Sequence, residues 1–263
     1  MFRARPKNPG AAADFMKNRI LEKLKTGETS IGSWLNLGSP LAAEVMASIG
    51  FDWLAVDGEH SPVDMGQIVG MFRAIEARGA TPIVRIWDHH PETIGRVLDA
   101  GAFGIVAPHV STAEQATQIA QAGRYPPRGK RSSGTGRAVT WGADYRSWIN
   151  DEVVVIPQIE DREGIRNAEA IMAVEGIDIG FLGPGDLSLE MGVPAGSLAH
   201  EEAIQQFLDA CKRAGKPCGI PVASGEALLE RKKQGFVFFD LSNDLRFLEI
   251  EAGRELRKAS GNA

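Results

Sequence analysis

Short apolar runs alternate with amphipathic stretches along most of the chain. The runs are rich in Val, Ile, Leu and Phe and are bounded by Gly, Pro and polar residues, which is typical of buried β-strands. We expect strands at 31–36, 53–57, 82–86, 104–108, 153–159, 177–182, 217–221 and 237–241.

Stretches with apolar residues at helical spacing lie between these runs, and several end at a glycine, the usual helix stop. They predict helices at 41–49, 64–77, 91–100, 112–122, 163–174, 201–214, 225–233 and 245–258. Eight alternating strands and helices predict a parallel sheet that closes as a (β/α)8 TIM barrel. An open doubly wound sheet is the alternative. We expect one domain over 1–263, with an N-terminal arm and helix in 1–28 (helical pattern at 11–25) and a C-terminal helix in 245–263.

Two connections, 125–150 and 187–202, are longer than the rest. Loops of this length in a compact domain are commonly functional. We expect the first to be a mobile basic flap that attracts an acidic substrate, and the second to be another cover loop. The basic residues of the flap are Arg128, Lys130, Arg131 and Arg137. A phosphate loop at Gly134-Thr-Gly136 is a weaker interpretation, because the Walker spacing is missing.

Two acids close consecutive apolar runs. Glu160 ends the run that begins at Val153, and Asp186 ends the run that begins at Ile177. Parallel strands of a barrel end at one rim, so the two carboxylates are expected to converge. Convergent carboxylates with backbone oxygens and water suit a hard divalent cation. Both acids could instead cap the helices that follow them.

Further polar residues are expected at the same rim. In Asp57-Gly-Glu-His60, an aspartate bonded to the imidazole would fix its tautomer and make His60 a general base; a capping role is the alternative. Arg85 lies inside an apolar strand, where a guanidinium needs an anionic partner. Its planar fork suits a substrate carboxylate or an enolate oxygen, and a structural salt bridge is the other interpretation.

The loop after the sixth strand and one amide complete the expected pocket. Gln158 points to the same side of its strand as Glu160. The flexible segment Gly183-Pro-Gly185 would let backbone N–H groups approach a ligand carboxylate. Among the other histidines, His89, His90 and His109 are expected near the rim, and His200 at the surface.

The lysines separate two mechanisms. A Schiff-base aldolase needs a lysine at the active end of a strand. None of the lysines lies within a predicted strand or at its C-terminal end, and Lys216 precedes the seventh strand. Metal activation of a carbonyl is therefore favoured over imine formation.

Composition narrows the class of protein. The formal net charge of −5 shows no basic excess for nucleic acid. No apolar stretch is long enough for a membrane span, and no signal peptide is recognised at the basic N-terminus. The two cysteines, Cys211 and Cys218, match no zinc or disulfide framework, so we expect a reducing cytoplasm.

Several motifs together resemble the HpcH/HpaI aldolases, which include the 4-hydroxy-2-oxoheptanedioate and 2-keto-3-deoxy sugar acid aldolases. The resemblance runs from about residue 31 to about residue 224 and thins beyond. The motifs are Asp57-Gly-Glu-His60, Val84-Arg85, Arg124-Tyr-Pro-Pro-Arg-Gly129, Gln158-Ile-Glu160, Val174-Glu-Gly-Ile-Asp178 and Gly183-Pro-Gly-Asp-Leu-Ser188.

The resemblance implies a phosphoenolpyruvate/pyruvate-type barrel and a class II aldolase that reversibly cleaves a 4-hydroxy-2-oxo acid to pyruvate and an aldehyde through a metal-stabilised enolate. Glu160 and Asp186 would bind Mg²⁺, Mn²⁺ or Co²⁺. Arg85 would hold pyruvate, and His60, oriented by Asp57, would act as base. Gln158, Gly183 and Gly185 would line the pyruvate pocket. Similar proteins are often hexamers, trimers of dimers with an exchanged C-terminal helix.

Two departures from the family pattern concern the aldehyde half of the substrate. The flap sequence at 130–137 and Pro221 at the seventh strand differ from the usual residues, and both are expected near the aldehyde. Two other functions stay open: a citrate-lyase-like CoA-ester lyase on a related barrel, and a non-catalytic barrel that binds a keto acid.

Overall fold

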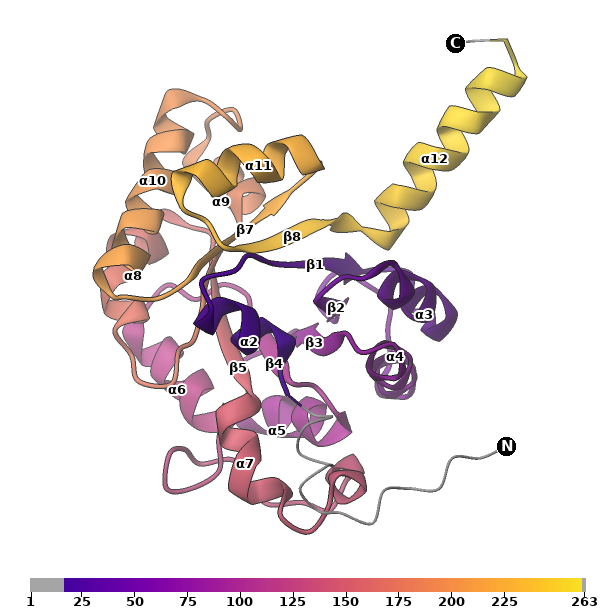
Figure 1. Cartoon of the computed structure of the whole chain (residues 1–263). Helices are drawn as coiled ribbons and strands as arrows, with labels where there is room; N and C mark the ends of the chain where they lie inside the picture. Colours follow the sequence, from indigo (N-terminus) through magenta and orange to yellow (C-terminus); the bar gives the residue numbers. More distant parts are fainter. Residues whose placement is uncertain (1–16, 262–263) are drawn as a thin grey trace.

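Eight parallel strands form a closed barrel in the computed structural model, which describes residues 17–261 (Figure 1). The strands follow one another around the barrel, and β1 pairs with β8 to close it. Their bounds are β1 Ser30–Leu35, β2 Trp53–Asp57, β3 Thr81–Arg85, β4 Gly104–Ala107, β5 Val154–Ile159, β6 Gly180–Leu182, β7 Cys218–Val222 and β8 Phe238–Asn243. The predicted TIM barrel is confirmed, and the open sheet is wrong.

Helices between the strands cover the outside of the barrel, α2 precedes the first strand and α12 follows the last. Their bounds are α2 Arg19–Lys25, α3 Pro40–Ile49, α4 Met65–Ala77, α5 Pro91–Ala100, α6 Ala113–Gly123, α7 Tyr145–Glu152, α8 Arg162–Met172, α9 Pro184–Met191, α10 Leu198–Arg213, α11 Gly225–Gln234 and α12 Asp244–Ala259, with a 3₁₀ turn η1 at Arg137–Trp141. The expected helices between strands are all present, and α7 and η1 were not expected. A helix at the place of α9 was considered only as one that Asp186 would cap, whereas Gly183 is its N-cap. Residues 11–16 of the expected N-terminal helix lie outside the described residues.

The interior of the barrel is filled by aromatic and branched side chains. Trp53 stacks on Phe238 with ring centroids 4.6 Å apart, and Trp34 meets Phe181 edge to face at 6.0 Å. Gly32 makes room for this packing, because a Cβ there would lie 2.0 Å from the Trp53 ring. A second apolar layer lies between strands and helices. Buried on both faces, the strands therefore appear in the sequence as continuous apolar runs.

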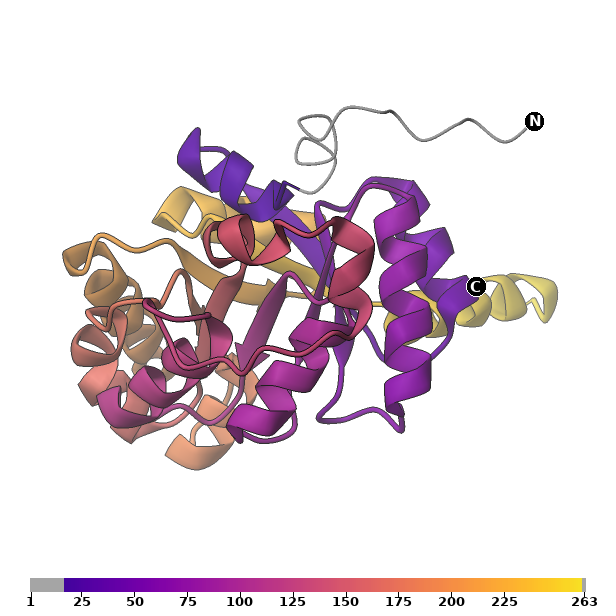
Figure 2. The same ribbon diagram turned by 90° about the horizontal axis from the view of Figure 1, so that it is seen from below.

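Helix α2 lies across the end of the barrel where the strands begin (Figures 1 and 2). Ile20 is fully buried and packs into the interior layer. Nζ of Lys23 lies 2.8 Å from a carboxylate oxygen of Asp52, which directly precedes β2. This end of the barrel is therefore closed, which leaves the rim at the C-terminal ends of the strands for ligands.

The long connection at 125–150 lies at the closed end, so the expected flap over the substrate is wrong. Its 3₁₀ turn and α7 pack near the ends of α4 and α5 that face the beginnings of the strands. Its arginines are engaged in ion pairs: Arg128–Asp151, Arg131–Asp99 and Arg137–Glu76. The physical reason is topological, since a segment that joins a helix to the next strand runs at the N-terminal end of the barrel. The departures at 130–137 therefore lie at the closed end of the barrel and not at the rim where they were expected.

Helix α12 projects from the body of the barrel (Figure 1). Its exposed apolar side chains are Leu245, Phe247, Leu248, Ile250 and Leu256. A groove of about 500 Å³ lies between α12 and α3, lined by Leu41, Val45 and Leu248 among others. No helix within residues 17–261 is long and apolar enough to cross a membrane.

Candidate active site

The polar residues predicted at the rim lie where the strands place them. Asp57 is the last residue of β2 and Arg85 the last of β3, and the two are in register. Gln158 lies in β5 and Glu160 follows it, with Gln158 in register with Phe181 of β6. Parallel strands end together, so residues far apart in sequence share one face of the barrel.

Arg85 is the central cation of the site. Its Nε donates to Oδ1 of Asp57 at 2.9 Å, and its Nη2 donates to Oδ2 at 2.6 Å. Its Nη1 lies 3.3 Å from Oε2 of Glu59, and its guanidinium carbon lies 4.8 Å from the centre of the Trp34 ring. The guanidinium is thus held from two sides and supported from a third, with 11% of the side chain exposed.

The expected hydrogen bond from the imidazole of His60 to Asp57 is wrong. Oδ1 of Asp57 instead accepts from the backbone N–H groups of Glu59 and His60 at 3.1 and 3.2 Å. Oδ2 accepts from Nδ2 of Asn36 at 2.7 Å. With Arg85, these donors use both oxygens. The imidazole of His60 is 62% exposed, and its Nε2 lies 3.6 Å from Oε2 of Glu59.

The environment of Asp57 favours its ionised form. Burial raises the pKa of Asp57, but the hydrogen bonds and charge of Arg85 and the backbone N–H groups of Glu59 and His60 bring that pKa below its ordinary value. Asp57 therefore serves Arg85 as a permanent counter-charge.

Glu160 is a buried acid with two donors on it. Its Oε2 accepts from Nε2 of Gln158 at 2.5 Å, and its Oε1 accepts from the backbone N–H of His109 at 2.7 Å. Burial raises the pKa of Glu160 and the charge of Asp186 raises it further, against the hydrogen bonds from Gln158 and His109. Asp186 is exposed in the first turn of α9. The two acids therefore lie near enough to interact electrostatically.

Gly183 is required by its neighbours. A Cβ at this position would lie 2.5 Å from Oε2 of Glu160 and 3.2 Å from Nε2 of Gln158. The N–H of Gly183 donates to the carbonyl of Ile159 at 2.9 Å, so it is not free for a ligand as the sequence suggested. Gly185 has open space around it. It lies in the first turn of α9, where helix N–H groups lack partners inside the helix.

His109 joins two acids of the rim. Its Nδ1 lies 2.9 Å from Oε1 of Glu160, and its Nε2 lies 2.9 Å from Oε1 of Glu59. Its φ of 54° is in the left-handed region, which is uncommon for a residue other than glycine and typical of functional sites. The sequence placed His109 near the rim but gave no sign of this backbone conformation or of the role of Glu59.

Asp240 is a further acid beneath the rim. It is buried in β8, and its Oδ1 accepts from the N–H of Trp34 at 3.2 Å. Burial raises the pKa of Asp240 well above its ordinary value, against the N–H of Trp34 and the charge of Arg85. Its register partner on β7 is Pro221, the second departure from the family pattern.

The acids of the rim fit a divalent cation that shares its coordination with a ligand. Within residues 17–261, no three His, Cys, Asp or Glu side chains are grouped to hold a metal by themselves. Glu160 and Asp186 nevertheless concentrate negative charge, and Oε1 of Gln158 is a buried acceptor without a hydrogen-bond partner. Mg²⁺ and Mn²⁺ prefer such oxygens and commonly bind through one or two carboxylates together with water and substrate.

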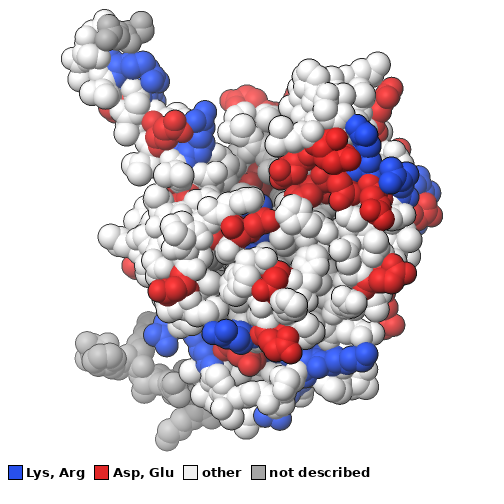
Figure 3. Space-filling model, turned by 180° about the vertical axis from the view of Figure 1, so that it is seen from behind, with Lys and Arg blue, Asp and Glu red and all other residues white. Residues whose placement is uncertain are grey.

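The surface charge near α9 is negative. Seen from behind, acidic side chains gather over α9 and the beginning of α10 (Figure 3), and Asp186 and Glu190 are exposed on α9. A field of this sign raises the local concentration of cations.

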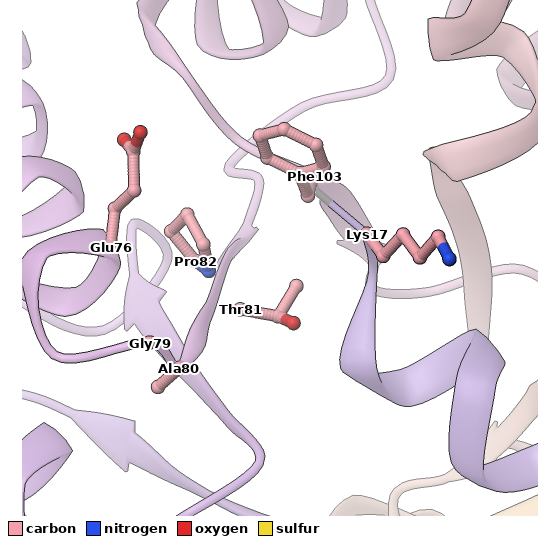
Figure 4. Close-up of a pocket in the computed structure, with 7 residues that line it drawn as sticks. All are labelled: Lys17, Glu76, Gly79, Ala80, Thr81, Pro82 and Phe103. Carbon is pink, nitrogen blue, oxygen red and sulfur yellow. The ribbon is translucent and has the colours of Figure 1, made fainter. Parts of the chain in front are cut away.

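A small pocket lies away from this rim. The pocket in Figure 4, of about 50 Å³, lies at the beginning of β3 and is lined by Thr81, Pro82 and Phe103 among others.

No lysine in the described part of the chain is found at the C-terminal end of a strand. Nζ of Lys216 donates to the carbonyl of Ile177, which precedes β6.

The family model described as HpcH/HpaI aldolase/citrate lyase matches residues 30–248 of the chain. A hydroxypyruvate/pyruvate aldolase of Chromohalobacter salexigens is 41% identical over 243 residues, which covers 89% of this chain and 95% of the relative. A 4-hydroxy-2-oxo-heptane-1,7-dioate aldolase of Escherichia coli is 37% identical over 240 residues, which covers 89% of this chain and 91% of the relative.

A solved structure with the same architecture is the HpcH/HpaI aldolase/citrate lyase family protein of Burkholderia cenocepacia. It superposes with a TM-score of 0.84 at 31% identity and covers 96% of this chain and 100% of the other. The HpcH/HpaI aldolase of Desulfitobacterium hafniense superposes with a TM-score of 0.86 at 26% identity, covering 91% of this chain and 96% of the other.

Proposed function

The chain belongs to the HpcH/HpaI aldolase/citrate lyase family and is a carbon–carbon lyase of the aldolase type, and from this premise we propose that it is a divalent-metal-dependent class II pyruvate aldolase. Its reaction is the reversible cleavage of a 4-hydroxy-2-oxo acid to pyruvate and an aldehyde. One observation carries the metal-dependent mechanism: the Arg85–Asp57 pair and the acids Glu160 and Asp186 lie at the same open rim of the barrel.

Glu160 and Asp186 would hold the cation, which we propose to be Mg²⁺, Mn²⁺ or Co²⁺. A cation bound there supplies a Lewis acid for the ketone oxygen of the 2-oxo acid. Nε2 of Gln158 donates to Oε2 of Glu160 at 2.5 Å and so fixes that carboxylate. The carbonyl oxygen of the Gln158 side chain stays available for a water or a ligand hydroxyl.

Arg85 would bind the oxygen on which charge develops. Two of its nitrogens are taken by Asp57, so Nη1 is the group that remains for the substrate beside Glu59. A fixed donor aimed at a developing oxyanion stabilises the transition state without reorganisation. The first turn of α9, at Gly185, offers backbone N–H groups that favour a carboxylate.

His60 would act as the base. Its imidazole is exposed at the mouth and lies next to Glu59. Glu59 would therefore orient the imidazole, a role that was expected of Asp57 from the sequence. In cleavage, His60 would accept the proton of the 4-hydroxyl group as the C3–C4 bond breaks. The electron pair of that bond forms the enolate of pyruvate, and protonation of its C3 completes the reaction.

We also propose a homo-oligomer, a hexamer built as a trimer of dimers, in which α12 is exchanged between paired subunits. The projecting α12 with its exposed leucines and the apolar groove beside α3 support this assembly. An exposed apolar surface of this kind is typical of a site of contact with another protein chain. We propose that residues 1–263 form one domain and that the protein works in the cytoplasm, consistent with two buried free cysteines, Cys211 and Cys218.

The test is an assay of pyruvate release from a 4-hydroxy-2-oxo acid with Mg²⁺, Mn²⁺ or Co²⁺. We expect EDTA to abolish turnover and added metal to restore it. Asp186→Asn should abolish the metal-dependent activity, whereas Asp209→Asn, the same change on the outer face of α10, should leave it unchanged. Turnover that survives EDTA and Asp186→Asn would show that the metal assignment is wrong. Cleavage of a CoA thioester, without cleavage of the 4-hydroxy-2-oxo acid, would favour the CoA-ester lyase.

A further inference from the structure

His200 is a buried histidine that the sequence placed at the surface, and that expectation is wrong. It lies in the first turns of α10 with 3% of its surface exposed. Its Nε2 lies 2.8 Å from the carbonyl oxygen of Pro184, and its Nδ1 accepts from the backbone N–H of Gly196 at 3.1 Å. Both ring nitrogens are therefore engaged by backbone groups of two different segments.

These two partners fix the tautomer of the ring. A carbonyl oxygen can only accept, so Nε2 of His200 must carry the hydrogen that is donated to Pro184. A backbone N–H can only donate, so Nδ1 must be bare to accept from Gly196. The imidazole thus links the first residue of α9 to the loop that joins α9 to α10.

Pro184 occupies a sensitive place in the site. The residue before Pro184 is Gly183, which lies against Glu160 and Gln158. Two residues after Pro184, in the first turn of α9, is Asp186. Proline has no N–H, so the carbonyl is the only backbone hydrogen-bonding group by which this residue can be held. The other end of α9 is held separately, since Oγ of Ser188 donates to the carbonyl of Val193 at 2.8 Å.

We propose that His200 is a positioning residue for metal binding: through the carbonyl of Pro184 it sets the direction in which the first turn of α9 presents Asp186. This inference rests on the proposed function, because it takes Asp186 as a ligand of the cation. Both ring nitrogens of His200 are engaged by backbone groups, so we assign it no direct contact with the cation or the substrate. Its effect passes through backbone, in the way that partners of ligands elsewhere control metal affinity.

Two substitutions separate the two hydrogen bonds of His200. Glutamine places its amide nitrogen near the position of Nε2, so His200→Gln keeps the donor to Pro184 and loses the acceptor for Gly196. Asparagine reaches only to the position of Nδ1, so His200→Asn keeps the acceptor for Gly196 and loses the donor to Pro184. Each variant lacks one bond, so a purely structural histidine would make the two equally harmful.

The experiment measures Mn²⁺ binding to the metal-free protein by electron paramagnetic resonance, without substrate, together with thermal unfolding. We expect both variants to lose similar thermal stability, but only His200→Asn to weaken Mn²⁺ binding, by about 10-fold. Equal affinities in the two variants, or a loss that merely follows the fall in Tm, would overturn the proposal. Asp186→Asn is measured alongside; if it keeps wild-type Mn²⁺ affinity, the metal assignment itself fails, and this inference with it.

A second measurement uses the unsubstituted protein and so does not depend on the folding of a variant. The ¹⁵N resonance of Nε2 of His200 is followed while Mg²⁺ is added. We expect the chemical shift to report the tautomer that is protonated at Nε2. We expect this shift to change with Mg²⁺ concentration according to the same dissociation constant as Mg²⁺ binding to the whole protein. A resonance that does not respond to saturating Mg²⁺ would contradict a link between His200 and the cation.

Discussion

The guanidinium of Arg85 is held by both carboxylate oxygens of Asp57, at 2.9 Å from Nε and 2.6 Å from Nη2. Two parallel bonds fix the plane of the fork as well as its position. Asp57 is fully buried and keeps its negative charge through this pairing. The pair therefore determines which edge of Arg85 faces the mouth of the barrel.

Replacing Arg85 with lysine should remove the edge of the guanidinium that faces the mouth of the barrel in a fixed orientation. A lysine ammonium is a point charge on a flexible stem and cannot bind Asp57 and a substrate oxygen in one plane. We expect kcat/KM for pyruvate release to fall by about 100-fold, the usual cost of losing one donor to a developing oxyanion. Arg213→Lys, at an exposed ion pair with Glu169, is the matched control. Unchanged kcat/KM would mean that Arg85 only forms a structural salt bridge.

Two glycines should respond differently to a methyl group. In Gly183→Ala the new Cβ would meet Glu160 at 2.5 Å, whereas in Gly95→Ala, within α5, it would meet nothing within 4 Å. We expect Gly183→Ala to displace Glu160 and to lower both Mn²⁺ affinity and kcat by about 10-fold, as overpacking costs about 1–3 kcal/mol. Gly95→Ala should stay within about twofold of wild type, because its methyl group meets no neighbour. Equal effects would refute the close approach of Gly183 to Glu160.

Asp240 should make stability depend on pH. Burial raises its pKa in the folded protein, so its contribution is fully present below the unfolded value of about 3.9 and is lost as pH rises through the folded pKa. Asp240→Asn does not titrate but keeps the acceptor for Trp34. We expect the stability of this variant relative to wild type to increase from pH 4 to pH 8, because only the wild type loses the contribution of a protonated Asp240 as the pH rises. Urea unfolding at both pH values measures this, and a constant difference would contradict it.

The assembly depends on the apolar side of α12. Leu248→Asp would place a charge in the groove beside Val45, at the contact proposed between subunits. We expect the hexamer to fall to smaller species in light scattering, since a buried unpaired charge costs several kcal/mol. Leu229→Asp, at an equally exposed leucine of α11, should leave the mass unchanged. A full-size assembly of the Leu248 variant would exclude this interface.

The fold and the approximate place of the site followed from the sequence. Buried strands give continuous apolar runs, and the polar residue that ends such a run lies at the rim, which located Arg85, Gln158 and Glu160. Polarity at a strand end does not say which partner a side chain takes. Asp57 was therefore assigned to His60, although Arg85 lies next to it in register across two strands.

The remaining errors concern segments whose position depends on the whole barrel. The loop at 125–150 is basic and long, which resembles a substrate flap, but its place between a helix and a strand puts it at the closed end. His200 follows a polar loop in the sequence, yet α10 buries it against α9. Only the packed structure provides the carbonyl and N–H that such a ring can satisfy.

The aromatic filling of the barrel bears on the order in which the proposed products leave. Trp34, Trp53 and Phe238 occupy the interior below Arg85, and α2 covers the far end, so the site opens at one mouth. In the proposed reaction a keto acid against Arg85 lies deeper than the aldehyde, so we expect it to depart second. Pyruvate should then inhibit cleavage competitively and the aldehyde noncompetitively, whereas the reverse pattern would point to a different arrangement of the two halves.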